Sequence, residues 1–249
     1  MKNILFIFVI SVIIAFANSC NKSDPPATID PATGCTNCTP STATTFVGLF
    51  RTGTYTVTAP ASTTTITTRA SAFFSSQPIN VSSVANSVTV ANVFFNSDTL
   101  KYSGAPNYYT NYTPINLASE TWSVNGSSGI PSFTFKNLKE KPSFLGIGAL
   151  PDTVRRSVGF SFIIYGLQNM TAASVYISDG WAIPSVFTKA LNVGTDTLVF
   201  SAQNLTAVNT STNASITVFM ENSFAVTVDG KDFKMSNETS FTKNVVIKN

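Results

Sequence analysis

Residues 214–235 read ASITVFMENSFAVTVDGKDFKM, and this stretch decides the fold class. Apolar and polar side chains alternate along most of it, and a period of two is typical of a β-strand with one buried face. Asp229-Gly230 is a strong signal for a type I′ turn between two antiparallel strands. Met220-Glu221-Asn222-Ser223 is interpreted as a second turn between two alternating runs. The C-terminal part of the chain is therefore predicted to be an antiparallel meander.

The rest of the chain after Phe46 follows the same pattern. Short apolar or alternating runs are separated by Gly, Pro, Asn and Asp, and none shows sustained helical spacing. We therefore predict an all-β fold. In the first half, strands are expected over 46–51, 65–74, 88–95, 99–102, 108–112, 120–124 and 132–135. In the second half, they are expected over 158–165, 173–177, 197–201, 214–219, 224–228, 232–235 and 242–247.

Seven short strands in each half fit an immunoglobulin-like β-sandwich. We predict two tandem immunoglobulin-like antiparallel sandwiches, over 46–140 and 152–249, joined by the Pro- and Gly-containing segment 141–151. Residues 20–45 are rich in Thr and Pro without apolar periodicity, so they are predicted to form an extended tether. Trp122 alternates with small polar neighbours and is predicted to be a core residue rather than a ligand platform.

The composition excludes several kinds of chemistry. The 249 residues include no histidine, which removes Ser-His-Asp and Cys-His catalysis and every His-ligated metal site. Only 11% of the residues are charged and the net charge is +3, with no dense basic cluster, so nucleic acid is not expected as a partner. Glu221, Asp229 and Asp232 lack the spacing of a calcium loop. No catalytic residue, metal site or cofactor is predicted.

The first residues have the order of an export signal. Lys2 precedes the apolar run 4–16, which is shorter than the roughly 20 residues needed to span a bilayer. The segment Phe16-Ala17-Asn18-Ser19-Cys20 resembles the lipobox of bacterial lipoproteins, although Asn18 departs from the usual small or aliphatic residue. The tail Asn21-Lys22-Ser23-Asp24 resembles that of surface-exported lipoproteins of the Bacteroidota.

This resemblance implies that residues 1–19 are a signal peptide and that Cys20 is lipidated after cleavage. It places the protein in the bacterial cell envelope, anchored by lipid to the outer membrane, with exposure at the cell surface as a further implication. An ordinary export signal with Cys20 as an unmodified thiol is the alternative.

Cys35 and Cys38 form a C-x-x-C pair within the predicted tether. Two thiolates without further ligands do not make a structural zinc site, and a redox motif needs a βαβ context that is absent here. In an oxidising envelope we predict a small disulfide loop, with metal capture or free thiols as the alternatives.

Three threonines follow an aspartate and precede an aliphatic residue: Thr99, Thr153 and Thr197. This pattern resembles the acceptor pattern for protein O-glycosylation in the Bacteroidota, which implies that the threonine hydroxyl carries a glycan. The simpler interpretation is that Asp closes a turn and Thr begins a strand.

An uncharged aromatic cluster at Tyr108, Tyr109 and Tyr112 is the best candidate for contacts with sugars, together with Trp181 in the turn Asp179-Gly180-Trp181. Aromatic rings can stack on sugar rings, and nearby Asn and Thr side chains can bind hydroxyls. A tyrosine-rich strand packed against its neighbours is the alternative.

The sequence therefore predicts a membrane-anchored envelope lipoprotein with a non-catalytic binding or adhesion role, its ligand a glycan or another envelope or host protein. A structural or accessory subunit of an outer-membrane complex is the alternative. A carboxylate-dependent hydrolase is a remote third, because it requires two acidic side chains to converge in one cleft.

Overall fold

The computed structural model describes residues 29–30, 34–36, 38–58, 64–79, 86–104, 107–111, 114–181 and 186–249. The predicted signal peptide and Cys20 lie outside these residues. Within them strands predominate, and α2 (Ala202–Leu205) is a single helical turn capped by the Ser201 side chain. The prediction of a mostly β fold is confirmed, whereas two tandem immunoglobulin-like domains are not shown.

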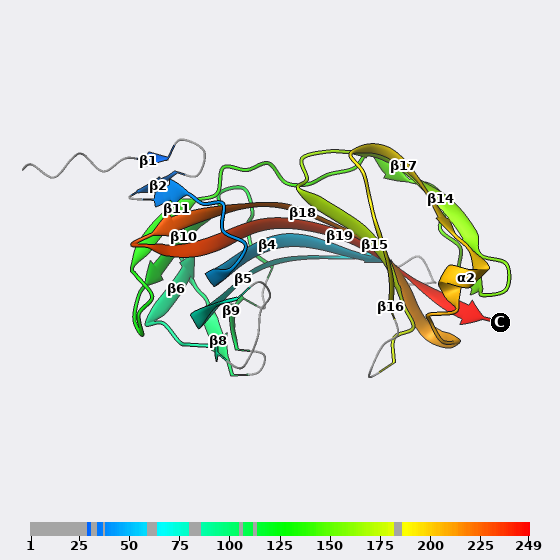
Figure 1. Cartoon of the computed structure of the whole chain (residues 1–249), viewed down its shortest axis with the longest axis horizontal. Helices are drawn as coiled ribbons and strands as arrows, with labels where there is room; N and C mark the ends of the chain where they lie inside the picture. The colour runs from blue at the N-terminus through cyan, green and yellow to red at the C-terminus, as the bar shows by residue number, and fades with distance from the viewer. Residues whose placement is uncertain are drawn as a thin grey trace, which may run out of the picture.

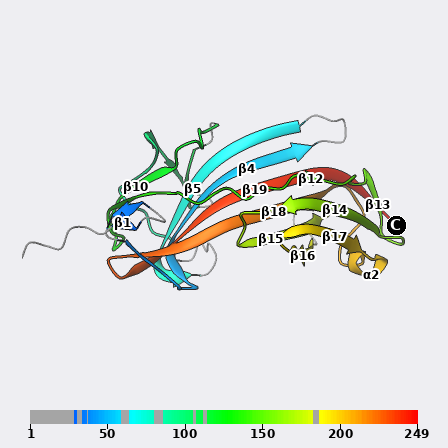
Figure 2. The same cartoon turned by 90° about the horizontal axis from the view of Figure 1, so that it is seen from above.

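The largest sheet has the strand order β16-β15-β18-β19-β4-β5-β9-β8, with β3 beside β18 and β13 beside β19. It is mixed, because β19 runs parallel to β4 and β13 but antiparallel to β18. The sheet arches along the length of the molecule (Figure 1), and β4 and β5 extend along one side of it (Figure 2). Its strands are β3 (Cys38–Pro40), β4 (Phe46–Thr58), β5 (Thr64–Ile79), β8 (Lys101–Ser103), β9 (Tyr108–Thr110), β13 (Thr153–Arg155), β15 (Ala172–Ser178), β16 (Val186–Ala190), β18 (Ser211–Val228) and β19 (Lys231–Lys248).

The hairpin of β18 and β19 is the centre of this sheet. The predicted turn at Asp229-Gly230 is confirmed, because both residues have the positive φ values, 48° and 72°, that a type I′ turn requires. The predicted turn at 220–223 is wrong: these residues continue β18 and pair with 236–239. Side chains still alternate through them, and the contacts that they make across the hairpin outweigh the low strand propensity of Asn and Glu.

Two smaller antiparallel sheets pack on the large one. The first has the order β11-β10-β6-β7 and the second the order β12-β14-β17, while β1 and β2 form a separate pair. Their bounds are β1 (Ile29–Asp30), β2 (Cys35–Thr36), β6 (Asn92–Phe95), β7 (Asp98–Thr99), β10 (Thr121–Asn125), β11 (Phe133–Lys136), β12 (Gly146–Ile147), β14 (Phe160–Leu167) and β17 (Gly194–Phe200).

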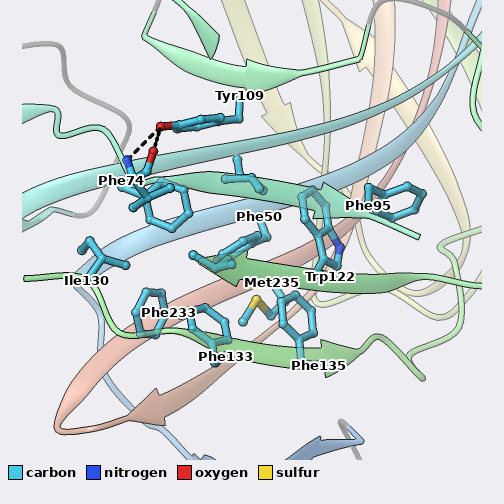
Figure 3. Packing of buried hydrophobic residues seen from close by; sticks show 14 of the residues in the cluster. Phe50, Phe74, Phe95, Tyr109, Trp122, Ile130, Phe133, Phe135, Phe233 and Met235 are labelled. Carbon is cyan, nitrogen blue, oxygen red and sulfur yellow. Dashed lines mark hydrogen bonds between the residues drawn. The ribbon is translucent and has the colours of Figure 1, made fainter. Parts of the chain in front are cut away.

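Each smaller sheet encloses a hydrophobic core. The Trp122 core lies under the first sheet, where Phe50 is surrounded by aromatic rings, among them Trp122 at 5.1 Å between ring centroids (Figure 3). The Phe200 core lies under the second sheet and is built from aliphatic side chains and a stack of Phe160, Phe162 and Phe200. Trp122 is therefore a core residue, as predicted.

Both cores lie on the same face of the large sheet. The register of β18 has no break between Ala214 and Val228, so alternate residues share one face. On this face, four residues belong to the Phe200 core: Ala214, Ile216, Val218 and Met220. Val226 and Val228, further along the same face, belong to the Trp122 core. Phe233 and Met235 of β19 also lie in the Trp122 core, although the sequence places them in the second predicted domain. The two cores therefore share one hairpin.

The segment 139–142, which leads into the predicted joint, crosses this face between the two cores (Figure 1). Three hairpin side chains donate hydrogen bonds to its backbone carbonyls: Asn237 to Lys139 (2.8 Å), Asn222 to Glu140 (2.9 Å) and Thr239 to Pro142 (2.8 Å). Beneath it, Asn137 donates to Asn237 Oδ1 (2.6 Å) and to Glu120 Oε2 (2.9 Å). We call Thr52, Glu120, Asn137 and Asn237 the polar knot; all four are buried.

The end of the predicted tether is part of the fold. β3 pairs with Val226–Val228, where β18 has no contact with β15, so the strand fills a vacant edge of the hairpin. Cys35 and Cys38 form a disulfide and are both buried in the Trp122 core. Within the predicted extended tether, residues 38–40 are therefore part of the folded sheet, because they pair with β18.

Candidate functional site

The opposite face of the large sheet is not covered by either smaller sheet. We call it the open face. Its central side chains come from three neighbouring strands: Arg51 and Tyr55 of β4, Lys234, Ser236 and Glu238 of β19, and Phe219 and Glu221 of β18. A small apolar cluster of Phe46, Leu49 and Phe73 lies at one end of the open face. Polar side chains dominate its middle.

A hollow of about 310 Å³ lies in the middle of the open face. This volume is at the lower end of the range for small-ligand sites. Two acidic side chains, two basic side chains, a serine hydroxyl and two apolar side chains line the hollow, and we call it the charged hollow. Its lining residues are Leu49, Arg51, Phe219, Glu221, Lys234, Ser236 and Glu238.

Glu238 is held by two partners from β4. Tyr55 donates a hydrogen bond to its Oε2 (2.6 Å), and Arg51 Nε lies 3.6 Å from its Oε1. The Tyr55 ring folds back over Gly53, where an added Cβ would lie 2.6 Å from the Tyr55 oxygen. Gly53 therefore makes the room that brings the hydroxyl to Glu238.

Burial sets the protonation chemistry of this pair. Desolvation raises the pKa of Glu238 above its ordinary value, and the hydrogen bond from Tyr55 and the charge of Arg51 only partly oppose this. Burial also raises the pKa of Tyr55, and the negative charge of Glu238 adds to the rise. The proton therefore stays on the tyrosine across the physiological range.

Glu221 lies directly opposite Glu238 in the ladder but has the opposite electrostatic balance. Burial alone would raise its pKa, but hydrogen bonds from Lys234 and Ser236, with the charge of Lys234, outweigh burial and hold the pKa below its ordinary value. Ser236 Oγ lies 2.7 Å from Glu221 Oε1, and Lys234 forms an ion pair with the same oxygen. Two facing carboxylates thus have pKa values displaced in opposite directions.

The charged hollow can bind both hydrogen-bond donors and hydrogen-bond acceptors of a ligand. Within the described residues, Arg51 makes its one ion pair through Nε, and its side chain is 37% exposed, so the terminal guanidinium nitrogens can donate to a ligand. The carboxylates can accept hydrogen bonds from hydroxyls, and the half-buried Phe219 ring supplies an apolar wall.

The predicted aromatic patch is not assembled in the structure. Tyr109 is buried, and its hydroxyl donates to the Val90 carbonyl (2.7 Å) and accepts from the Val90 N–H (2.8 Å; Figure 3). Tyr108 is half-buried against Phe73, and Tyr112 lies outside the described residues. Tyr108 and Tyr109 both pack against neighbouring rings, which is the alternative considered from the sequence.

Trp181 is 61% exposed but lies far from these tyrosines. It follows β15, which is five strand positions from β9 in the large sheet, or roughly 24 Å at the usual strand spacing. It lines a separate shallow hollow with Ser211, Thr212 and Asn213. The proposed tyrosines and Trp181 therefore do not share one binding surface.

The three Asp-Thr-aliphatic sites have one geometry. Thr99, Thr153 and Thr197 are exposed on β7, β13 and β17, and the aliphatic residue that follows each of them is buried. Strand alternation alone produces this arrangement, and it leaves all three hydroxyl-bearing side chains on the surface.

The charged hollow was missed by reasoning from sequence, although a signal for it exists. A two-residue turn at Asp229-Gly230 pairs Val228 with Lys231, and counting back along both strands pairs Glu221 with Glu238. The interpretation of 220–223 as a turn interrupts that count, so from the sequence Glu221 is grouped with Asp229 and Asp232 instead of with Glu238.

In the described ranges, no three Cys, Asp or Glu side chains are arranged to hold a metal ion. In the same ranges, none of the helical segments has the length and apolar character that crossing a membrane requires.

No protein-family model matches the chain, and no curated protein matches it in sequence.

Proposed function

We propose that this chain is a lipid-anchored protein of a bacterial cell envelope that binds a glycan through the charged hollow without transforming it. The anchor is the lipidated Cys20 implied by the export signal, and the outer membrane is its proposed location. The observation that carries the binding proposal is a preformed hollow with paired charges on a sheet face that neither smaller sheet covers.

The chemistry of the hollow favours a hydroxyl-rich ligand over a simple ion. Arg51 and Lys234 balance Glu221 and Glu238, so the hollow has no net charge to attract a small anion or cation. Sugar hydroxyls both donate and accept, so they can bind carboxylates and cationic side chains together, while Phe219 offers a surface for a sugar ring. A protein ligand presenting similar groups is the second possibility within this role.

The test is a titration of the chain with a panel of neutral and acidic oligosaccharides, followed by two-dimensional NMR. We expect shifts at residues of the charged hollow. Arg51→Gln and Lys234→Gln should each weaken binding about tenfold or more, since each removes a charge-assisted hydrogen bond. Trp181→Ala is the control and should leave binding unchanged. Loss of binding in Trp181→Ala alone would contradict the proposal.

The facing carboxylates support a second candidate, hydrolysis of a glycosidic bond. Such enzymes need one carboxyl group that donates a proton and one carboxylate that acts as base or nucleophile. Glu238 and Glu221 have the corresponding difference in pKa direction. Each is already paired with a cation and a hydroxyl, which favours binding over catalysis. Release of new reducing ends from a bound oligosaccharide, lost in both Glu221→Gln and Glu238→Gln, would establish hydrolysis instead.

Exposure of the three hydroxyl groups supports O-glycosylation at Thr99, Thr153 and Thr197. Intact mass of the chain extracted from membranes tests this modification together with lipidation of Cys20.

A role as accessory subunit predicts instead a stoichiometric protein partner and no affinity for glycans. We also propose an immunoglobulin-like sandwich arrangement around each core, since each core lies between two sheets.

A further inference from the structure

The first part of β5 is an edge that no described residue covers. β5 pairs with β9 only at Ser71 and Ala72, so Thr64 to Thr67 extend beyond the neighbouring strand. The Ala70 carbonyl accepts from Asn111 on this side, so the backbone groups of Ile66 and Thr64, which share its parity, also point outward. In Figure 2, β5 is the outer border of the sheet toward this end.

This edge lacks the usual protection against pairing with another strand. Natural edge strands are blocked by Lys, Pro or a bulge, and residues 64–68, Thr-Thr-Ile-Thr-Thr, contain none of these. Ile66 is 66% exposed. The Thr68 side chain bonds to the backbone of Ile115, which marks where the uncovered edge ends.

The sequence of the edge is symmetric about Ile66. In an antiparallel pair of two identical strands centred there, Ile66 faces Ile66, Thr65 faces Thr67 and Thr64 faces Thr68. Each of these pairs is favourable or neutral, and no charge faces a like charge. A two-fold axis through Ile66 is therefore compatible with the side chains of residues 65–67, the part of the segment that ends before the Ile115 contact at Thr68.

We propose that a second copy of this chain docks on this edge, pairing its β5 antiparallel to the first about Ile66. The pairing joins two sheets into one and leaves the open faces of both copies on the same side. Such a short edge contact belongs to the small, reversible class of interfaces. The proposal does not depend on glycan binding.

Sedimentation equilibrium of the full chain from Cys20 onward, with Cys20→Ser to remove its thiol, tests the proposal up to about 1 mM protein. We expect reversible dimers. Ile66→Lys should weaken association at least about tenfold, because it places like charges opposite each other at the axis. Val57→Lys is the matched control and should still dimerise, because this exposed apolar residue lies one strand further in, on β4 opposite Thr65. A monomer at every concentration, or dimers insensitive to Ile66→Lys, would overturn the proposal.

Thiol trapping tests the register independently. Facing residues in this pairing have Cα atoms about 5.5 Å apart, within disulfide range, whereas the two copies of Thr64 are separated by about four residues of strand. Under mild oxidation, Ile66→Cys should therefore form a covalent dimer and Thr64→Cys should not. Circular dichroism of each variant shows that the fold is kept. Equal trapping of both variants would rule out the proposed axis.

Discussion

Gly53 shows how one missing side chain shapes the charged hollow. Because Gly53 has no Cβ, the Tyr55 ring can lie directly over its backbone. We predict that Gly53→Ala displaces the ring, breaks the hydrogen bond to Glu238 and lowers the free energy of unfolding by about 1–2 kcal/mol. In a Tyr55→Ala background the same substitution should cost almost nothing, since the ring is gone. Urea denaturation of the four proteins in this double-mutant cycle measures the coupling. Equal costs in both backgrounds would mean that Gly53 acts independently of Tyr55.

Glu221 and Glu238 should give stability opposite dependences on pH. The pKa of Glu238 is raised in the folded state, so the folded chain binds more protons and loses stability as pH rises through the range above 4.5. Glu221 has a lowered pKa, so its contribution is present above 4.5 and is lost as pH falls through the folded-state value. The free energy of unfolding of Glu238→Gln, relative to wild type, should therefore increase with pH.

The same quantity for Glu221→Gln should decrease as pH rises toward neutrality. Denaturation midpoints at several pH values between 3 and 7 provide the measurement, at roughly one-unit steps around the carboxyl range. Parallel curves for the two variants would contradict the assigned partners, because the variants remove the same chemical group from facing positions.

The segment 139–142, which leads into the joint, is held on the hairpin by polar contacts, whereas Phe144, Ile147 and Leu150 further along pack on the Phe200 core. Asn237 lies at the centre, since it bonds to the Lys139 carbonyl and to Asn137 and Thr52 of the polar knot. Asn237→Ala leaves buried polar groups unpaired, and we predict a loss of about 2–3 kcal/mol in the free energy of unfolding. Asn244→Ala on the same strand should change stability by less than about 0.5 kcal/mol. Similar losses for both variants would show that the knot contributes no special stability.

The strands themselves were largely predictable from alternation, but their lengths and partners were not. The turn at Asp229-Gly230 was readable because its chemistry is local. At 220–223 local chemistry suggests a second turn, and only the facing strand, with Ser236 to Thr239 opposite that segment, shows why β18 continues. Trp122 was identified as core from its neighbours, whereas burial of Tyr109 depends on Val90, a contact distant along the sequence.

The charged hollow illustrates the same limit for the site. Its members lie on β4, β18 and β19, and the parallel pairing of β4 with β19 joins residues separated by most of the chain. Hairpin register could have paired Glu221 with Glu238, but nothing local indicates that Arg51 and Tyr55 reach them. The site therefore follows from sheet order, which strand periodicity does not determine.

The molecule as a whole has two hydrophobic cores on one hairpin. The Trp122 core includes Val226, Val228, Phe233 and Met235, while the other halves of β18 and β19 complete the Phe200 core. Losing either core would leave apolar side chains of the hairpin exposed. We therefore predict that both ends unfold as one cooperative unit, unlike two domains in tandem.

Hydrogen exchange followed by mass spectrometry tests this central claim most directly. Phe50→Ala removes a ring at the centre of the Trp122 core and should cost about 3–5 kcal/mol. If the hairpin couples the cores, the most protected amides of β14 and β17, at the far end, should lose the same protection as those of β10. Loss of protection confined to β6, β10 and β11, with β14 and β17 unchanged, would show two independent units and contradict the account.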